Sequence, residues 1–130
     1  MNEHRHRLLV YYEDTDFTGA VYHSNYLNFF ERAREHMIGV DRLARLHREE
    51  GVGFVVYRAE LQYRSPAFHS DELEIRSVIL DSTPYRIRFG QSAWRGDEKL
   101  VDGTVELVCV GRDRKLVAVP DGIRQELESG

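Results

Sequence analysis

The chain has 130 residues, of which 42% are hydrophobic and 31% are charged, and its formal net charge is -4. This length predicts one domain spanning residues 1–130 with a core of its own, and the composition excludes a disordered chain. The mildly acidic balance, without a lysine- or arginine-rich run, argues against nucleic acid as a partner, because phosphate neutralisation supplies most of that affinity.

The first ten residues, MNEHRHRLLV, are charged and contain no apolar stretch of signal-peptide length. No segment approaches the roughly 20 apolar residues of a membrane span. We therefore expect a cytoplasmic protein without membrane insertion. His4 and His6 alternate with arginines in a terminus that we expect to be mobile, and a short apolar run at 8–12 follows.

A helical period begins after Asn25. The apolar residues that share one helical face are Tyr26, Phe29, Phe30, Ala33 and Met37. Ser24 or Asn25 is a suitable N-cap and Gly39 a suitable stop, with a further turn or two within 41–50. Together these signals predict one long helix of about six turns with a single apolar stripe.

From Tyr57 the period changes to two. Tyr57, Ala59, Leu61 and Tyr63 alternate with charged or polar residues, which predicts a half-buried antiparallel strand. Similar alternation follows within 71–80, 85–94 and 99–110, and GRDRK predicts a hairpin turn into LVAV. Cys109, the only cysteine, lies in an apolar run and is expected in the core. The fold class is α+β, with about five to six antiparallel strands wrapped around one long helix.

Two aspartates lie in the turn that precedes this helix, within YYEDTDFTGAVYHSNYLNFFERAR. A carboxylate near a helix start is stabilised by the free N–H groups there, which is one explanation of Asp14 and Asp16. However, both lie about ten residues before the cap. Gly19 allows the intervening loop to double back and to expose backbone N–H groups, which could hold an oxyanion. The residues alone leave a capping turn and an active site both open.

The same stretch resembles the signature of hotdog-fold acyl-CoA thioesterases of the YbgC and 4-hydroxybenzoyl-CoA thioesterase type. That pattern is an Asp-x-Asp pair, small residues with a glycine, an aromatic residue, and then His-x-Asn-Tyr. The corresponding positions here are Asp14, Asp16, Gly19, Tyr22, His23, Asn25 and Tyr26. The resemblance implies a hotdog fold and hydrolysis of a short-chain or aromatic acyl-CoA without a cofactor. Thr18, Ala20 and Ser70 depart from the usual pattern and leave the acyl preference open.

The resemblance also implies roles for individual residues. It matches Asp16 to the catalytic carboxylate, which would act as nucleophile or as general base. His23 would assist water or the leaving thiolate, although a loop histidine that only supports the helix start is the alternative. Backbone N–H groups around Tyr22 and His23 would form the oxyanion hole. The residues expected to contact substrate are Tyr12, Gly19, Tyr22 and Asn25.

Partners and alternative functions follow from the same resemblance. We expect acyl-CoA as substrate and a homodimer or homotetramer, because hotdog proteins of this kind build the site between subunits. Arg86, Arg88 and the loop 111–115 are candidates for the coenzyme A phosphates. No histidine or cysteine spacing predicts a metal site. A dehydratase or hydratase of 3-hydroxyacyl thioesters, and a non-catalytic acyl-CoA sensor, are the alternative functions.

Overall fold

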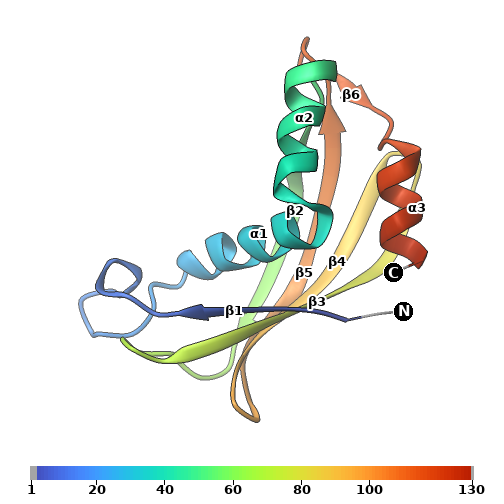
Figure 1. The fold of residues 1–130 in the computed structure, drawn as a ribbon. Coiled ribbons are helices and arrows are strands. Elements are labelled where there is room, and N and C mark those ends of the chain that lie inside the picture. The colour runs from blue at the N-terminus through green and yellow to red at the C-terminus, as the bar shows by residue number, and fades with distance from the viewer. Residues whose placement is uncertain (1–2, 130) are drawn as a thin grey trace.

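The computed structural model describes residues 3–129, which form an antiparallel sheet with helices (Figure 1). In chain order the elements are β1 (His4–Leu9), the short 3-10 helix η1 (Tyr12–Asp14), α1 (Asn25–Ile38), α2 (Val40–Glu50), β2 (Gly53–Tyr63), β3 (Glu72–Thr83), β4 (Arg86–Arg95), β5 (Glu98–Val110), β6 (Leu116–Val117) and α3 (Asp121–Ser129). The strand order is β1-β3-β4-β5-β2, with β6 pairing the end of β5. The predicted α+β class and the six strands are confirmed.

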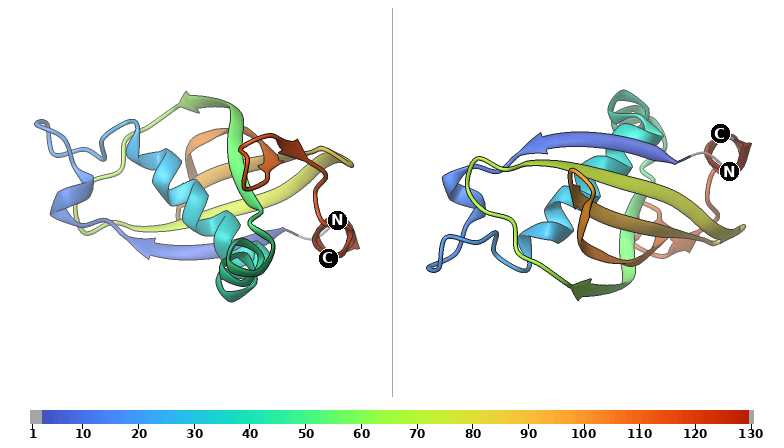
Figure 2. Two further views of the ribbon diagram at one scale, coloured as in Figure 1. Left: turned by 90° about the horizontal axis from the view of Figure 1, so that it is seen from above. Right: turned by 90° about the horizontal axis from the view of Figure 1, so that it is seen from below.

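Helix α1 carries the predicted apolar stripe into the core. Tyr26, Phe29, Phe30 and Ala33 are buried and pack against residues of β3, β4 and β5. The strands curve around this helix, so that β1 and β2, the two ends of the strand order, lie on opposite sides of it (Figure 2). The sheet therefore covers α1 as predicted, and the start of α1 is held against a rigid surface.

The prediction of one long helix is wrong, because the chain turns at Gly39. This residue has φ +116°, a conformation that favours glycine, and its N–H donates to Glu35 O to close α1. Figure 1 shows α2 leaving in a new direction. A third helix, α3, was not predicted. Its buried residues Ile123 and Leu127 join a second core cluster with Cys109, whose pKa burial raises to about 12.

The N-terminal segment also differs from its prediction. His4–Leu9 is not mobile but pairs antiparallel with β3, from His4 opposite Ser77 to Leu9 opposite Glu72. The ring of His6 stacks on His36 of α1 at 4.6 Å between centroids. Backbone pairing and this contact order the segment, whereas its charged composition alone suggested a free end.

Strand β2 is more exposed than predicted. Among residues 3–129 it pairs with β5 alone, so its other side is an open edge of the sheet. A bulge at Tyr57 interrupts the expected alternation, because Val56 pairs with Leu107 and Arg58 already pairs with Glu106. Tyr57 is 62% exposed and Tyr63 is 50% exposed. The predicted half-burial is wrong because most side chains from Val55 to Tyr63 are exposed, although Tyr63 still packs edge-on to Tyr26 of α1.

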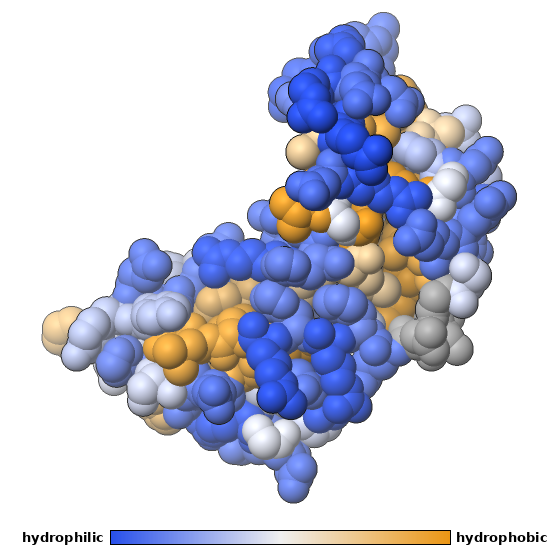
Figure 3. Space-filling model, in the orientation of Figure 1, coloured by the Kyte–Doolittle hydropathy of each residue, from blue (hydrophilic) through white to orange (hydrophobic). Residues whose placement is uncertain are grey.

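The surface is mostly hydrophilic, with hydrophobic residues showing at the base of α2 and in the hollow toward α3 (Figure 3). Within residues 3–129, none of the helices has the length and apolarity needed to span a membrane.

Candidate active site

The segment between β1 and α1 doubles back on itself, as Gly19 was expected to allow. Gly19 has φ +88° and its N–H donates to Asp16 O at 3.1 Å, while Asp16 N–H donates to Ala20 O at 2.7 Å. Further along, Val21 N–H donates to Ala67 O at 2.8 Å. These bonds fix a tight loop whose tip is Asp16–Gly19 and whose base is held by the core.

Asp14 lies at the base of this loop and is 8% exposed. Its Oδ2 accepts from Tyr11 N–H at 2.9 Å, and its Oδ1 accepts from Asn25 Nδ2 at 2.8 Å. Its carbonyl oxygen accepts from Tyr22 N–H at 2.8 Å. Asp14 therefore joins the two ends of the loop, because one carboxylate satisfies donors from both.

Asp16 has a different environment, two residues later. It is partly exposed, and its Oδ1 accepts from Thr18 N–H at 2.8 Å and from Thr18 Oγ at 2.7 Å. No donor within residues 3–129 hydrogen-bonds to its Oδ2. The Thr18 hydroxyl and then the Thr18 N–H lower the pKa of Asp16 below its ordinary value. The backbone N–H groups of Ala20 and Gly19 lower this pKa further, so at neutral pH Asp16 is an anchored carboxylate.

The start of α1 supplies backbone donors. The predicted donor Tyr22 N–H is not free, because it is bonded to Asp14 O. In the described part of the chain, the N–H groups of His23 and Ser24 have no acceptor, and no side chain caps the helix. Ser24 is the N-cap, whose N–H a helix start leaves unpaired, and His23 directly precedes it. Of the predicted pair, the Tyr22 N–H is therefore occupied and the His23 N–H is unpaired, and their role as oxyanion donors remains a prediction.

Tyr63 of β2 is bonded to the same backbone. Its hydroxyl donates to His23 O at 2.8 Å, and its ring packs edge-on to Tyr26. Burial raises the pKa of Tyr63, so that its hydroxyl keeps the proton that it donates. This bond joins the edge strand to the helix start, and it also polarises the peptide group that carries the Ser24 N–H.

The other predicted site residues around this loop differ in their exposure and in their contacts. His23 is exposed, with its ring 4.5 Å from that of Tyr22. Tyr12 is 79% exposed and stacks on His69 at 4.1 Å. The side chain of Asn25 is engaged inside the chain, since it donates to Asp14 and accepts from Asn28. The substrate contacts proposed for these residues remain predictions.

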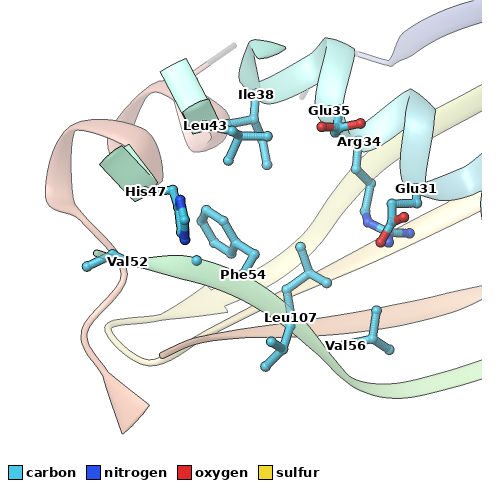
Figure 4. A pocket seen from close by; sticks show the side chains of 12 residues that line it. Glu31, Arg34, Glu35, Ile38, Leu43, His47, Val52, Phe54, Val56 and Leu107 are labelled. Carbon is cyan, nitrogen blue, oxygen red and sulfur yellow. The ribbon is translucent and has the colours of Figure 1, made fainter. Parts of the chain in front are cut away.

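A pocket of about 510 Å³ lies at the other end of α1, between α1, α2 and β2 (Figure 4). Ile38, Leu43, Phe54 and Leu107 form apolar walls, and Arg34 lies among them with only 4% exposure. Burial lowers the pKa of Arg34, although the charge of Glu31 opposes this shift. Among the described residues, no ion pair joins Arg34 to Glu31 within 4.0 Å, although the two are one helical turn apart.

Two of the arginines proposed for the coenzyme A phosphates have partners already. Arg88 is paired with Asp81, and Arg86 lies 3.6 Å from Glu106 and over the ring of Tyr57. Their role toward phosphate remains a prediction. Across residues 3–129, no group of three or more His, Cys, Asp or Glu side chains is arranged to hold a metal ion.

Sequence reasoning missed three residues that shape this region: Thr18, Tyr63 and Arg34. The hydrogen bond from Thr18 to Asp16 could have been predicted, because a residue two positions after an aspartate commonly donates to its side chain. Tyr63 and Arg34 had no such signal, because their partners lie about 40 and 57 residues away in the sequence.

Comparison with known proteins places the chain in a family. A model of the thioesterase-like superfamily matches residues 10–127. The acyl-CoA thioester hydrolase YbgC of Escherichia coli O6:H1 is 37% identical over 103 residues, which cover 78% of this chain and 77% of that protein. The acyl-CoA thioesterase YbgC of Haemophilus influenzae is 35% identical over 118 residues, covering 88% and 87% respectively.

Solved structures agree. The crystal structure of a probable thioesterase from Bartonella henselae is similar with a TM-score of 0.84 at 32% identity, covering 92% of this chain and all of that one. The resemblance read from the Asp-x-Asp to His-x-Asn-Tyr segment is confirmed, and so is the hotdog fold. The chain therefore belongs to the thioesterase-like superfamily and is a thioesterase enzyme.

Proposed function

We propose that the protein hydrolyses a short-chain or aromatic acyl-CoA to the free acid and coenzyme A, with Asp16 as the central catalytic group. The observation that carries this proposal is the state of Asp16, which is partly exposed, is held through Oδ1 by Thr18, and has no hydrogen bond to its Oδ2 within residues 3–129. The sequence relatives named as acyl-CoA thioesterases support the choice of substrate.

Two routes are open to this carboxylate. Asp16 Oδ2 can attack the thioester carbonyl carbon, expelling the thiolate and forming a mixed anhydride that water then hydrolyses. Alternatively, it takes a proton from a water that attacks the same carbon, and the thiolate leaves with a proton. In both routes the anionic form of Asp16 is required, and the Thr18 bonds favour that form.

The carbonyl oxygen becomes negative in either route and needs donors. The N–H groups of His23 and Ser24 at the start of α1 are suited to this task, because they are unpaired and lie at the positive end of the helix. The exposed imidazole of His23 would orient water or assist the leaving thiolate. Tyr12, Gly19 and Tyr22 would contact the substrate beside this loop. Asn25 would act indirectly, by holding Asp14.

Self-association completes the proposal. β2 is an open edge with exposed Val55, Val56, Tyr57 and Tyr63, and such an edge invites pairing with another strand. We propose that two copies pair through β2 to form a homodimer, and that a homotetramer forms where two such dimers bury a second face. The protein is expected to act in the cytoplasm without membrane insertion.

The test measures release of free thiol from a panel of short-chain, long-chain and aromatic acyl-CoA thioesters. We expect turnover by the wild-type protein and a fall of at least about 10²-fold in a folded Asp16→Asn variant, the loss typical of a positioned acid or base. Glu13→Gln, an exposed acid in the same loop, is the matched control and should keep its rate. Absence of thiol release with acyl-CoA binding intact would contradict the proposal and favour a sensor.

A further inference from the structure

Three histidines lie where β1 packs against the C-terminal half of α1. The ring of His6 stacks on that of His36, with 4.6 Å between the centroids and 19° between the planes. His4 and His6 are half-buried, whereas His36 is exposed on the helix. These three residues, His4, His6 and His36, are called the histidine cluster below. The chemistry proposed for Asp16 does not use them.

The ring of His4 lies in a place that suits only its neutral form. Among residues 3–129, His4 Nδ1 is the one fully buried side-chain nitrogen or oxygen without a hydrogen-bond partner. His4 also lines a pocket of about 270 Å³ with the apolar residues Ile38, Ile123 and Leu127. Protonation of Nδ1 would bury an N–H donor and a positive charge where no acceptor reaches them. The surroundings of His4 therefore oppose its protonation.

The stacked pair opposes protonation for a second reason. Two imidazoles in contact repel each other once both are charged, because like charges at this distance interact strongly. Burial, followed by the charge of His36, lowers the pKa of His4. Burial also lowers the pKa of His6, and the charges of His36, His4 and Arg32 lower it further. The cluster is therefore stable as a set of neutral rings.

The acids near the start of β1 do not offset a charge on the cluster. In the described part of the chain, no histidine lies within 4.0 Å of a carboxylate oxygen. Glu3 and Glu126 line the same pocket as His4, but both have other partners. Glu3 accepts from Arg5 at 3.1 Å, and Glu126 pairs with Arg42 of α2 at 2.6 Å. Neither acid is therefore available to a protonated histidine without breaking a pair.

The other elements around β1 offer no negative charge either. The residues of β3 opposite the two histidines of β1 are Ser77 and Ile75, which do not titrate. The two arginines of β1 alternate to the other face of the strand, where both lie within 4.0 Å of Glu74. The acids of α1, Glu31 and Glu35, line the pocket beside β2, on the opposite side of the helix from β1 (Figure 2). Protons added to the cluster would thus remain uncompensated.

Strand β1 has few other contacts that would hold it in place. It is an end strand of the sheet and, within residues 3–129, pairs with β3 alone. Directly after it, Val10 is buried and Tyr11 N–H donates to Asp14 Oδ2 at 2.9 Å. Separation of β1 from α1 would therefore loosen the base of the loop that carries Asp16.

We propose that the histidine cluster is an acid-sensitive contact, which holds β1 against α1 while its rings are neutral and releases β1 and the loop 11–24 when they are protonated. The pKa of His4 and that of His6 are lower in the folded chain than the ordinary value of 6.5, so the open strand binds more protons than the closed one. The closed form is therefore most stable above pH 6.5 and loses stability as the pH falls below it. This inference goes beyond the proposed function, because it concerns the stability of a strand.

The test is amide hydrogen exchange of the whole chain at about pH 7.5 and about pH 5.5, expressed as protection factors that remove the intrinsic effect of pH. We expect the protection of the β1 amides bonded to β3 to fall by about 5-fold or more at the lower pH. Tyr22 N–H and Asp16 N–H, whose bonds close the loop, should lose protection together with β1. The amides of β4, in the middle of the sheet, should keep theirs.

Variants locate the response. His6→Phe keeps an aromatic ring against His36 but cannot take up a proton, and it should remove most of the change. His36→Gln removes the facing charge and should reduce the change. Because His36 is exposed, this second variant should fold even if His6→Phe does not. His47→Gln, at an exposed histidine of α2, is the matched control and should retain the full change.

Four results would overturn the proposal. They are equal protection of β1 at both pH values in the wild-type protein, an equal loss in β4, a full change in folded His36→Gln, and a loss in β1 that leaves Tyr22 N–H and Asp16 N–H protected. An equal loss in β4 would indicate acid unfolding of the whole sheet. Amide exchange needs no turnover, so these results decide the role of the cluster even if no thioester is hydrolysed. Hydrolysis together with an unchanged β1 would leave the proposed function standing and refute the acid-sensitive contact.

Discussion

Asp14 and Asp16 lie two residues apart in one loop and have opposite environments. Asp14 is buried, and both of its carboxylate oxygens accept hydrogen bonds from the chain. Asp16 is partly exposed, and only its Oδ1 is bonded, to Thr18. A carboxylate whose bonds are all satisfied stabilises a structure, whereas one with a free, ionised oxygen can react. This difference supports the proposal that Asp16 is the catalytic carboxylate and that Asp14 holds the loop together.

The largest effect on stability should come from the base of the loop. Asp14→Ala removes the acceptor for Tyr11 N–H and Asn25 Nδ2, leaving donors unpaired in a partly buried place, and we expect a loss of about 2–4 kcal/mol in the free energy of unfolding. Urea denaturation measures it. Asp16→Asn should change this free energy by less than about 0.5 kcal/mol, and equal losses in the two variants would remove the contrast between the aspartates.

The next largest effect should come from Tyr63, which holds the backbone at the start of α1. Tyr63→Phe removes the hydrogen bond to His23 O, so the peptide group before Ser24 is less firmly oriented. We expect kcat to fall by about 10-fold with KM little changed, because the bond acts on the transition-state donors. Tyr57→Phe, on the same strand, is the control. A fall in thermal stability or dimer content that accounts for the lost activity would instead indicate a structural role.

A smaller loss of stability is expected from a substitution at Gly19, in the tip of the loop. Gly19→Ala places a side chain at φ +88°, where nothing lies within 4 Å of the added methyl group, so the cost is backbone strain alone, about 1 kcal/mol. Gly53→Ala has equal space but no positive φ and should cost less. Thermal unfolding of both variants compares them, and a larger loss in Gly53→Ala would refute the assignment of strain to Gly19.

The smallest expected effect is a shift in the pKa of Asp16. Thr18→Val removes the hydroxyl that most lowers the pKa of Asp16, so this pKa should rise while the Thr18 N–H bond still holds it in part. Because Asp16 must be anionic, activity is present above its pKa and lost as pH falls through it, and the acidic limb should move to higher pH in the variant. Carbon-detected NMR titration measures the shift. A pKa that stays unchanged would show that the hydroxyl does not govern Asp16.

Individual helices and strands could be predicted where interactions between residues close in sequence decide them. The stripe from Tyr26 to Ala33 gives a helix because those residues share one face, and the alternation from Ile87 to Ala93 gives a strand whose alternate side chains are buried. Local signals also existed for α3, where Ile123 and Leu127 are four residues apart. A helix of nine residues is marginal alone, however, and packing against the sheet stabilises it.

The sequence by itself determined the helix start, the strands and the motif with its two aspartates, because these depend on neighbours within a few residues. Only the tertiary structure decided that Asn25 bonds to Asp14 across the loop, that Tyr22 N–H is occupied, that β2 is an open edge, and that Arg34 is buried beside Gln91. Each of these depends on contacts between distant segments. Burial and hydrogen bonding are properties of those contacts, so residue type and spacing do not fix them.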